Sequence, residues 1–286
     1  MALFPRFQLF EIEDMPWCPS WLREYAHRAL HQMWNTIGPG RTSSTAAQAC
    51  DILVSKLPNE PGAYTFVDAC AGAGGPTPML ERSLNSRLKV LGAKKPVRFL
   101  LADLYPDWAA WKKITSASEN ITHVNQPIDA TTVERYVNDG TLECRLFNLC
   151  FHHFDDVQAA KILRSAVNHS DTLVIFEMTQ RNLPALLNTS IVILSPLIST
   201  LLWFWWSPLH MVFTYLIPIV PLFFAWDGFV SCIRTRSGQE IRDIIAREEA
   251  RGSLDTSEWT FHYGQTKVLP PFGNLYWFIG VKNRKD

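Results

Sequence analysis

The chain has 286 residues, which is enough for one large domain or one domain with a substantial insertion. Its 27 Lys and Arg residues balance its 27 Asp and Glu residues, so it has no overall basic field and we expect no nucleic-acid partner. The six cysteines form no CxxC pair and no zinc spacing, and the sequence predicts no metal site.

The compartment can also be predicted. The first residues lack the long apolar core of a signal peptide, and the scattered cysteines suit a reducing environment. We therefore expect an intracellular protein.

Helices open the chain, and strands then alternate with helices. Residues 17–34 and 45–57 have the apolar spacing of helices. The expected strands span residues 64–70, 97–104, 121–129, 143–151 and 171–178. The expected helices between them span residues 78–91, 107–117, 131–138 and 155–168. Alternation of this kind predicts a parallel sheet with helices on both faces.

The end of the chain adds a helix and a hairpin. Ser237 and Glu240 form a capping-box pattern that opens a helix, and residues 259–269 and 274–282 read as two strands. The predicted fold is α/β, with a Rossmann-like, seven-stranded, mostly parallel sheet and a C-terminal antiparallel hairpin. Residues 1–60 are expected to form an N-terminal helical cap, 61–181 and 237–286 the core, and 182–236 a hydrophobic helical insertion.

One short stretch carries the family resemblance. Asp68-Ala-Cys-Ala-Gly-Ala-Gly-Gly75 ends an apolar strand and continues with almost no side chains. Together with the element order, it resembles the first motif and the fold of class I S-adenosylmethionine-dependent methyltransferases. The resemblance covers Tyr64 to Lys282 without the insertion. The motif departs from the common pattern at Ala71 and Ala73, where Ser or Gly is usual.

A subgroup of methyltransferase-like proteins is more similar still. The similarity rests on five short segments, namely residues 13–17, 74–76, 102–106, 151–154 and 214–235, the last being TYLIPIVPLFFAWDGFVSCIRT. The resemblance implies S-adenosyl-L-methionine as the cofactor, but it does not supply a methyl acceptor.

The glycine-rich turn gives the first predicted cofactor contacts. Glycines let the main chain bend tightly and approach a ligand within van der Waals distance, as Gly72, Gly74 and Gly75 would here. The resemblance implies that Asp68 serves the methionine part of the cofactor, with Ala69 beside it. A plain strand–turn–helix is the alternative interpretation.

The next two strand ends supply further candidates. Asp103 and Leu104 follow the second strand, where a carboxylate can accept two hydrogen bonds from a ribose diol. The resemblance implies that Asp129 and Ala130 recognise the adenine. A helix N-cap or surface role is the alternative for Asp103, and a cap on the helix at Thr131 is the alternative for Asp129.

The fourth strand end brings the predicted chemistry. The resemblance places Asn148 and Leu149 at the boundary between cofactor and acceptor, and His152 and His153 follow at once. Imidazole titrates near neutral pH, so either histidine could act as a general base. Packing or helix capping is the alternative. We do not expect the pair to bind a metal, because adjacent side chains on an extended run point apart.

The insertion is unusual in its composition. Residues 182–226 contain no Asp, Glu, Lys or Arg, and two apolar blocks, 186–206 and 209–226, approach the roughly 20 residues that cross a bilayer. The interpretations are a membrane hairpin entered from the cytosolic side, an apolar lid over the substrate, or a core or dimer face. In class I methyltransferases, insertions at this place often determine substrate specificity.

The sequence therefore predicts methyl transfer to a hydrophobic small molecule or lipid, with possible membrane contact through residues 186–226. The N-terminal helix, with Trp21, Tyr25 and Trp34, could cover the site. Alternatives are a cyclase or isomerase on the same scaffold, and a non-catalytic membrane-associated protein. A nicotinamide dehydrogenase is less favoured, because the turn lacks GxGxxG spacing.

Overall fold

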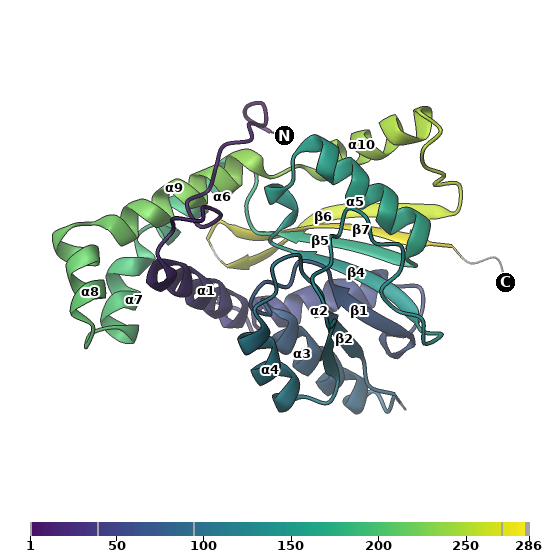
Figure 1. The fold of residues 1–286 in the computed structure, drawn as a ribbon, viewed down its shortest axis with the longest axis horizontal. Coiled ribbons are helices and arrows are strands. Elements are labelled where there is room, and N and C mark those ends of the chain that lie inside the picture. The colour runs from purple at the N-terminus through teal and green to yellow at the C-terminus, as the bar shows by residue number, and fades with distance from the viewer. Residues whose placement is uncertain (1, 39, 94, 270, 284–286) are drawn as a thin grey trace.

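The computed structural model describes residues 2–38, 40–93, 95–269 and 271–283, and the other positions of the predicted ranges lie outside the described residues. One seven-stranded sheet runs through it in the order β3-β2-β1-β4-β5-β7-β6 (Figure 1). The strands are β1 Tyr64–Asp68, β2 Arg98–Leu101, β3 Ile121–His123, β4 Leu142–Asn148, β5 Thr172–Glu177, β6 Trp259–Leu269 and β7 Gly273–Lys282. Strands β1 to β5 are parallel, and β7 pairs antiparallel with β5 and β6, so the predicted fold class is confirmed.

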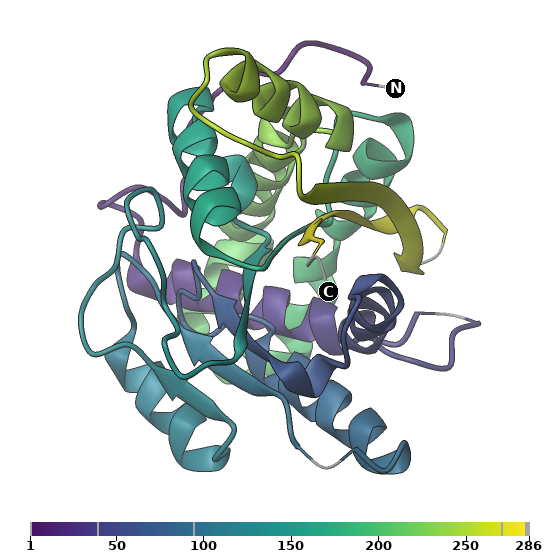
Figure 2. The ribbon, with the colours of Figure 1, turned by 90° about the vertical axis from the view of Figure 1, so that its right-hand side faces the viewer.

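Helices cover both faces of this sheet (Figures 1 and 2). One face packs against α2 Thr45–Lys56, α3 Thr77–Val90 and α4 Trp108–Ala117. The other packs against α5 Asp156–His169 and α10 Gly238–Ala250. Every residue of β1, β4 and β5 is buried, as expected for strands that are covered on both sides. The capping box between Ser237 and Glu240 forms as predicted.

The insertion builds a separate layer beyond the carboxyl ends of the strands. It comprises α6 Leu183–Val192, α7 Ser195–Trp203, α8 Pro208–Met211, the π-helix η3 Val212–Leu216 and α9 Ile219–Arg234. Helix α1, Ser20–Asn35, lies against it, while α2 joins the main core beside α3. In Figure 1, α7, α8 and one end of α9 project away from the sheet.

The region between β3 and β4 differs from the prediction. The strand expected over residues 121–129 ends at His123, and residues 131–138 form turns in place of a helix. The buried carboxylate of Glu143 explains the missing helix, because it accepts hydrogen bonds from the backbone N–H groups of Tyr136 (2.8 Å) and Val137 (3.0 Å). Those donors are then not available for the i to i−4 bonds of a helix.

Candidate functional site

The glycine turn after β1 has the backbone geometry that only glycine adopts easily. Gly72, Gly74 and Gly75 have φ angles of 50°, 103° and 44°. A Cβ on Gly74 would lie 2.2 Å from the Cδ1 atom of Ile114, so this glycine also allows close packing against α4. The indole of Trp111 donates a hydrogen bond to the Gly72 carbonyl (2.8 Å) and fixes the turn from behind.

Asp68 and Asn148 end two adjacent strands with polar atoms that lack partners. Asp68 Oδ2 accepts a hydrogen bond from the Thr77 hydroxyl (2.6 Å). Asp68 Oδ1 and both polar side-chain atoms of Asn148 are buried and make no hydrogen bond to a described residue. Burial raises the pKa of Asp68 to about 6, although the Thr77 hydroxyl and the nearby Asn148 amide oppose the shift. Buried polar atoms without partners are costly, so this pair fits a site that a polar ligand completes.

Asp103 supports the turn as well as facing the cavity. Its Oδ2 accepts a hydrogen bond from the Gly72 N–H and its Oδ1 one from the Tyr105 N–H, both at 2.7 Å. A carboxylate oxygen can accept more than one hydrogen bond, so both oxygens can still receive a ribose diol. Replacing Asp103 would therefore disturb the glycine turn together with any ligand.

Asp129 stabilises a local turn of the chain, although the helix that it was expected to cap at Thr131 is absent. Its Oδ1 accepts a hydrogen bond from the Thr131 N–H (2.8 Å) and forms a turn of the chain. Asp129 and Ala130 nevertheless line the same cavity as Asp103.

These strand ends surround a cavity of about 790 Å³. The predicted cofactor residues that line it are Ala69, Gly72, Gly75, Asp103, Leu104, Asp129, Ala130, Asn148 and Leu149. Asp68 and Gly74 lie behind this wall and support it, since Asp68 is buried beneath the turn and Gly74 packs on α4.

The opposite wall comes from the N-terminal segment and α1. Its charged residues are Glu13, Asp14, Arg23, Glu24, His27 and Arg28. Of the three aromatic residues expected over the site, Trp34 lines this cavity, whereas Trp21 and Tyr25 stack on rings of the insertion. The four-residue spacing of Arg23 and His27 on one helix face was the available sequence signal for this wall.

A second cavity of about 540 Å³ lies beside the first and is mostly apolar. Helices α1, α6, α7 and α9 supply most of its wall, including Met33, Val192, Leu202 and Phe223. Leu149 and His153 line both cavities, so the two spaces meet at the end of β4. The apolar composition of the insertion is evident from the sequence, whereas the cavity that it encloses is evident only from the structure.

The backbone is strained at the place where the cavities meet. Leu149 has a φ of 55°, the one positive φ among the described non-glycine residues. A branched side chain in this region costs about 1–2 kcal/mol. Strain of this kind persists only where the surroundings enforce it, and it often marks functional sites.

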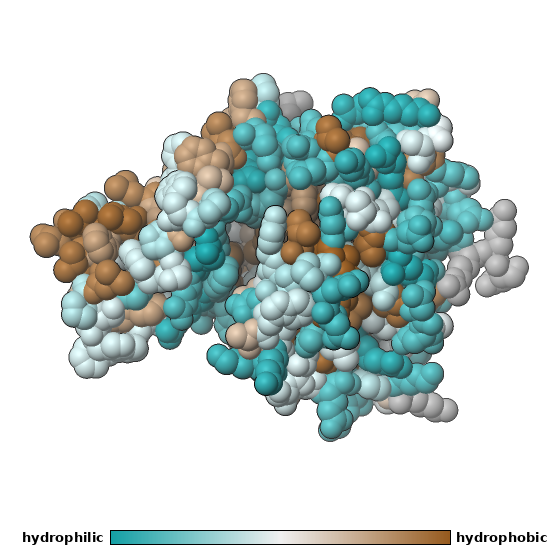
Figure 3. Space-filling model, viewed as in Figure 1, coloured by the Kyte–Doolittle hydropathy of each residue, from teal (hydrophilic) through white to brown (hydrophobic). Residues whose placement is uncertain are grey.

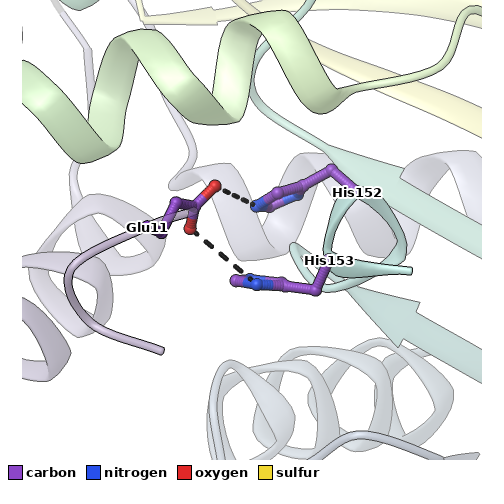
Figure 4. Close-up of side chains that lie close together, drawn as sticks. All are labelled: Glu11, His152 and His153. Carbon is purple, nitrogen blue, oxygen red and sulfur yellow. Dashed lines mark ion pairs between the residues drawn. The ribbon is translucent and has the colours of Figure 1, made fainter. Parts of the chain in front are cut away.

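His152 is held tightly between two carboxylates, of which Figure 4 shows Glu11. Its Nδ1 lies 2.8 Å from Glu177 Oε2, and its Nε2 lies 3.5 Å from Glu11 Oε1. Burial lowers the pKa of His152, but Glu177 and Glu11 outweigh burial and raise it to about 10. His152 is therefore a protonated, ion-paired imidazolium at neutral pH, which makes it a poor general base.

His153 is more accessible and has one ring nitrogen without a described partner. Its Nδ1 lies 3.0 Å from Asp14 Oδ2, which leaves Nε2 as the nitrogen that can accept a proton. Burial raises the pKa of Asp14, but His153 and Arg234 bring it down to about 2, so Asp14 is ionised. A carboxylate at Nδ1 and a free Nε2 is the arrangement of an oriented general base.

The two histidine rings do not point apart, so the premise used against a metal site is wrong. Phe151–His153 is a 3₁₀ turn, and the ring centroids lie 4.3 Å apart. Glu11, His152 and His153 bring possible ligand atoms within 4.8 Å of one another (Figure 4). Arg234 lies 3.4 Å from Glu11 and 3.0 Å from Asp14, so its guanidinium forms ion pairs with both acids, and His152 adds a second cation at Glu11. The cluster is complete as an ion-paired network.

Three segments that the sequence analysis singled out converge on this network. Arg234 donates hydrogen bonds to the carbonyl groups of His152 (3.2 Å) and His153 (2.9 Å). Asp227 accepts hydrogen bonds from the N–H groups of Ile12 (2.7 Å) and Glu13 (2.9 Å). The WDGFVSCIRT stretch of α9 therefore fastens the N-terminal segment over the FHHF turn. This role depends on residues more than 200 positions apart and has no local sequence signal.

Comparison with known proteins supports the fold. No model of a protein family matches this chain, and no curated protein sequence does. Among solved structures, the CMeT domain of the citrinin polyketide synthase is 13% identical, with a TM-score of 0.51, over 96% of this chain and 60% of that one. An O-methyltransferase family protein from Burkholderia thailandensis is 15% identical, with a TM-score of 0.44, over 85% of this chain and 57% of that one.

The chain thus spans less than two thirds of the length of either structure. Identities this low establish the fold alone, and the lower TM-score adds no argument. The observed strand order and the match to the CMeT domain agree with the resemblance seen in the sequence. The protein has the fold of the class I S-adenosylmethionine-dependent methyltransferases.

Proposed function

We propose that this protein transfers a methyl group from S-adenosyl-L-methionine to a hydrophobic small molecule or lipid. The observation that carries the proposal is the meeting of two unlike cavities at Leu149 and His153. One cavity has glycine backbone and carboxylates at the carboxyl ends of parallel strands, which is where open α/β sheets bind ligands. The other is apolar and follows from the insertion.

The residues of the first cavity suit the parts of the cofactor. The unpaired polar atoms of Asn148, which lines the cavity in front of Asp68, fit its polar amino-acid portion, and Asp103 fits the ribose diol. Asp129 and the Ala130 backbone fit the adenine edge. When bound, the cofactor supplies a methyl group on a positively charged sulfonium, which is reactive without help from a metal.

The second cavity would position the acceptor and keep water away from it. Its apolar wall favours an apolar acceptor by the hydrophobic effect and excludes water from the reacting atoms. Holding the acceptor at the junction of the cavities converts a reaction between two molecules into one within a complex, which can lower the barrier by several kcal/mol.

For an acceptor that carries a hydroxyl, His153 is the proposed base. Its Nε2 would take the hydroxyl proton while Asp14 holds Nδ1 and stabilises the imidazolium that forms; the methyl group would exchange its bond to sulfur for a bond to the acceptor oxygen, which leaves S-adenosylhomocysteine. His152 acts beside it as a fixed positive charge that positions Glu11.

The test is isothermal titration calorimetry with S-adenosylhomocysteine on wild type, Gly72→Ala and Gly92→Ala. Both glycines have positive φ (50° and 73°), and no described heavy atom lies within 4 Å of a Cβ at either position. The two variants should lose similar stability, about 1–2 kcal/mol each. Only Gly72 lines the cavity, so we expect about 100-fold weaker binding in Gly72→Ala and wild-type binding in Gly92→Ala.

A second readout tests the transfer itself. Cofactor carrying a labelled methyl group, incubated with the protein and an apolar metabolite extract, should deliver label to an extractable product. Folded wild type that fails to bind S-adenosylhomocysteine would rule out the proposal. Binding without any labelled product would favour the cyclase or isomerase alternative.

A further inference from the structure

The far end of the insertion exposes large apolar side chains at its surface. The apolar tip is defined here by Leu194, Ile198, Leu202, Trp205, Trp206 and Leu216, which are between 59% and 77% exposed. Figure 3 shows this end of the molecule, on the left, as its most hydrophobic region. A contiguous apolar patch of this kind on a soluble domain usually marks an interaction site.

The tip buries polar side chains and exposes apolar ones, which is the reverse of a helical layer that faces water. Thr200 and Thr214 are buried and hydrogen-bond to each other (3.0 Å), and Tyr25 of α1 hydrogen-bonds to Thr200 (2.9 Å). The polar atoms therefore face inward and satisfy one another, while Leu202 and Leu216 face outward. This arrangement is stable in an apolar medium and costly in water.

A lipid surface fits this tip better than a second copy of the chain. The exposed side chains come from α7, η3 and the loops beside them, so they wrap a projection and do not form one flat, self-complementary face. Residues 182–226 carry no Asp, Glu, Lys or Arg that would have to be desolvated or could pair with a protein partner. Trp205 and Trp206 lie together at the end of α7, and tryptophan is enriched at membrane interfaces.

The chain path indicates insertion into one leaflet and argues against crossing. The stretch Leu183–Trp203 is long and apolar enough to span a membrane, and 28% of its most apolar 18 residues are buried. The following pair, Pro208–Leu216 and Ile219–Arg234, is bent by 70°. The chain enters the insertion from β5 and returns to α10 of the same domain, and α1 already covers the inner face of α9, which leaves only the outer end of the insertion free to enter lipid.

The apolar cavity opens on this same surface. Ile198 and Leu202 line the cavity and are also 67% and 69% exposed, so they form part of its mouth. A molecule dissolved in the lipid could enter there without passing through water.

We propose that the apolar tip inserts into one leaflet of a lipid bilayer and that the acceptor is a membrane-dissolved apolar molecule that enters the cavity beside Ile198 and Leu202. The second half of this inference rests on the proposed methyl transfer, and the first half does not.

The experiment is flotation of the full-length protein with phosphatidylcholine vesicles, at low and high salt. Wild type should float with the vesicles at both salt concentrations, because salt does not screen the apolar contacts that would hold it there. Leu202→Glu combined with Trp205→Glu should lower the bound fraction at least about tenfold. The matched control is Val90→Glu combined with Leu91→Glu, two apolar positions at the end of α3 that are even more exposed (87% and 74%), and it should float like wild type.

Further readouts separate the possible failures. Unchanged S-adenosylhomocysteine binding would show that the tip variant is folded, and sedimentation without lipid would report self-association. The inference would be overturned if wild type did not bind the vesicles. It would also be overturned if wild type formed a dimer that does not bind vesicles and that the tip variant disrupts. Labelled methyl transfer into a lipid extract presented in the same vesicles should fall at least about tenfold in the tip variant; equal transfer would overturn the entry route.

Discussion

Strand β4 and the insertion both contain leucines, but they place them in opposite environments. All of β4, Leu142–Asn148, is buried under helices on both faces, whereas the apolar tip of the insertion faces outward. Residue type alone therefore does not decide burial. The strand has partners within the chain, and the tip has partners for its inner face only.

The inner face of the insertion belongs to the N-terminal segment. Leu22, Tyr25 and Ala26 of α1 pack with Val220 and Phe223 of α9 in one buried cluster. The insertion is thus packed on the side that faces α1 and the two cavities, and it exposes large apolar side chains on the far side. This division between a packed inner face and an exposed outer face can be tested by mutation, beginning where the two cavities meet.

The largest effect is expected at His153, which lines both cavities. If the acceptor carries a hydroxyl, His153→Ala should lower kcat about 1,000-fold, because general base catalysis contributes on that scale. Asp14→Asn should lower kcat by about 100-fold or more, since an amide at Nδ1 no longer fixes the tautomer or stabilises the imidazolium. Affinity for S-adenosylhomocysteine should change little in both variants.

The matched control is His262→Ala, on the exposed face of β6. It should leave kcat unchanged. A His153→Ala variant as active as wild type would show that the acceptor needs no base, as expected for an amine or carbon acceptor.

The contrast in packing should appear directly in stability. Leu146→Ala, in the middle of β4, should cost about 3 kcal/mol of unfolding free energy, because it leaves a cavity in a core that cannot collapse. Leu202→Ala should cost less than about 0.5 kcal/mol in lipid-free buffer, since its side chain already contacts water. Urea unfolding of both variants provides the measurement, and equal costs would mean that the tip is packed against something in solution.

A smaller effect on stability is expected from the ion-paired network around His152. The pKa of His152 rises from an ordinary 6.5 to about 10 in the folded protein, so its stabilising charge is fully present below pH 6.5 and is lost as pH rises through 10. The stability advantage of wild type over His152→Gln should therefore shrink by an amount on the order of 2 kcal/mol between pH 6.5 and pH 10.

Unfolding titrations at several pH values give that difference, and taking the difference removes the contribution of other titrating groups. If the variant does not fold, NMR of the wild-type imidazole serves instead, and it should show His152 protonated at pH 8. A ring that loses its proton near pH 6.5 would contradict the ion-paired arrangement.

Much of the fold was predictable because its signals are local. Apolar runs bounded by glycine and proline identified the strands, and the capping box at Ser237 identified the start of α10. The helix expected over residues 131–138 was wrong because Glu143, a residue of the neighbouring strand, binds the backbone donors that a helix would need. No pattern within that segment reports a partner that arrives from another strand.

The amino-acid pattern was sufficient to predict the parallel sheet, the glycine turn with Asp68 and Asp103 near it, and an apolar insertion after β5. These features follow from periodicity, from the φ angles that glycine permits and from residue polarity. Which histidine keeps an unpaired ring nitrogen depends on tertiary contacts, because Glu11, Asp14 and Arg234 reach the pair from distant parts of the chain. The tertiary structure also decided that the insertion encloses a cavity and faces its leucines outward, because burial depends on which surfaces meet and not on how apolar they are.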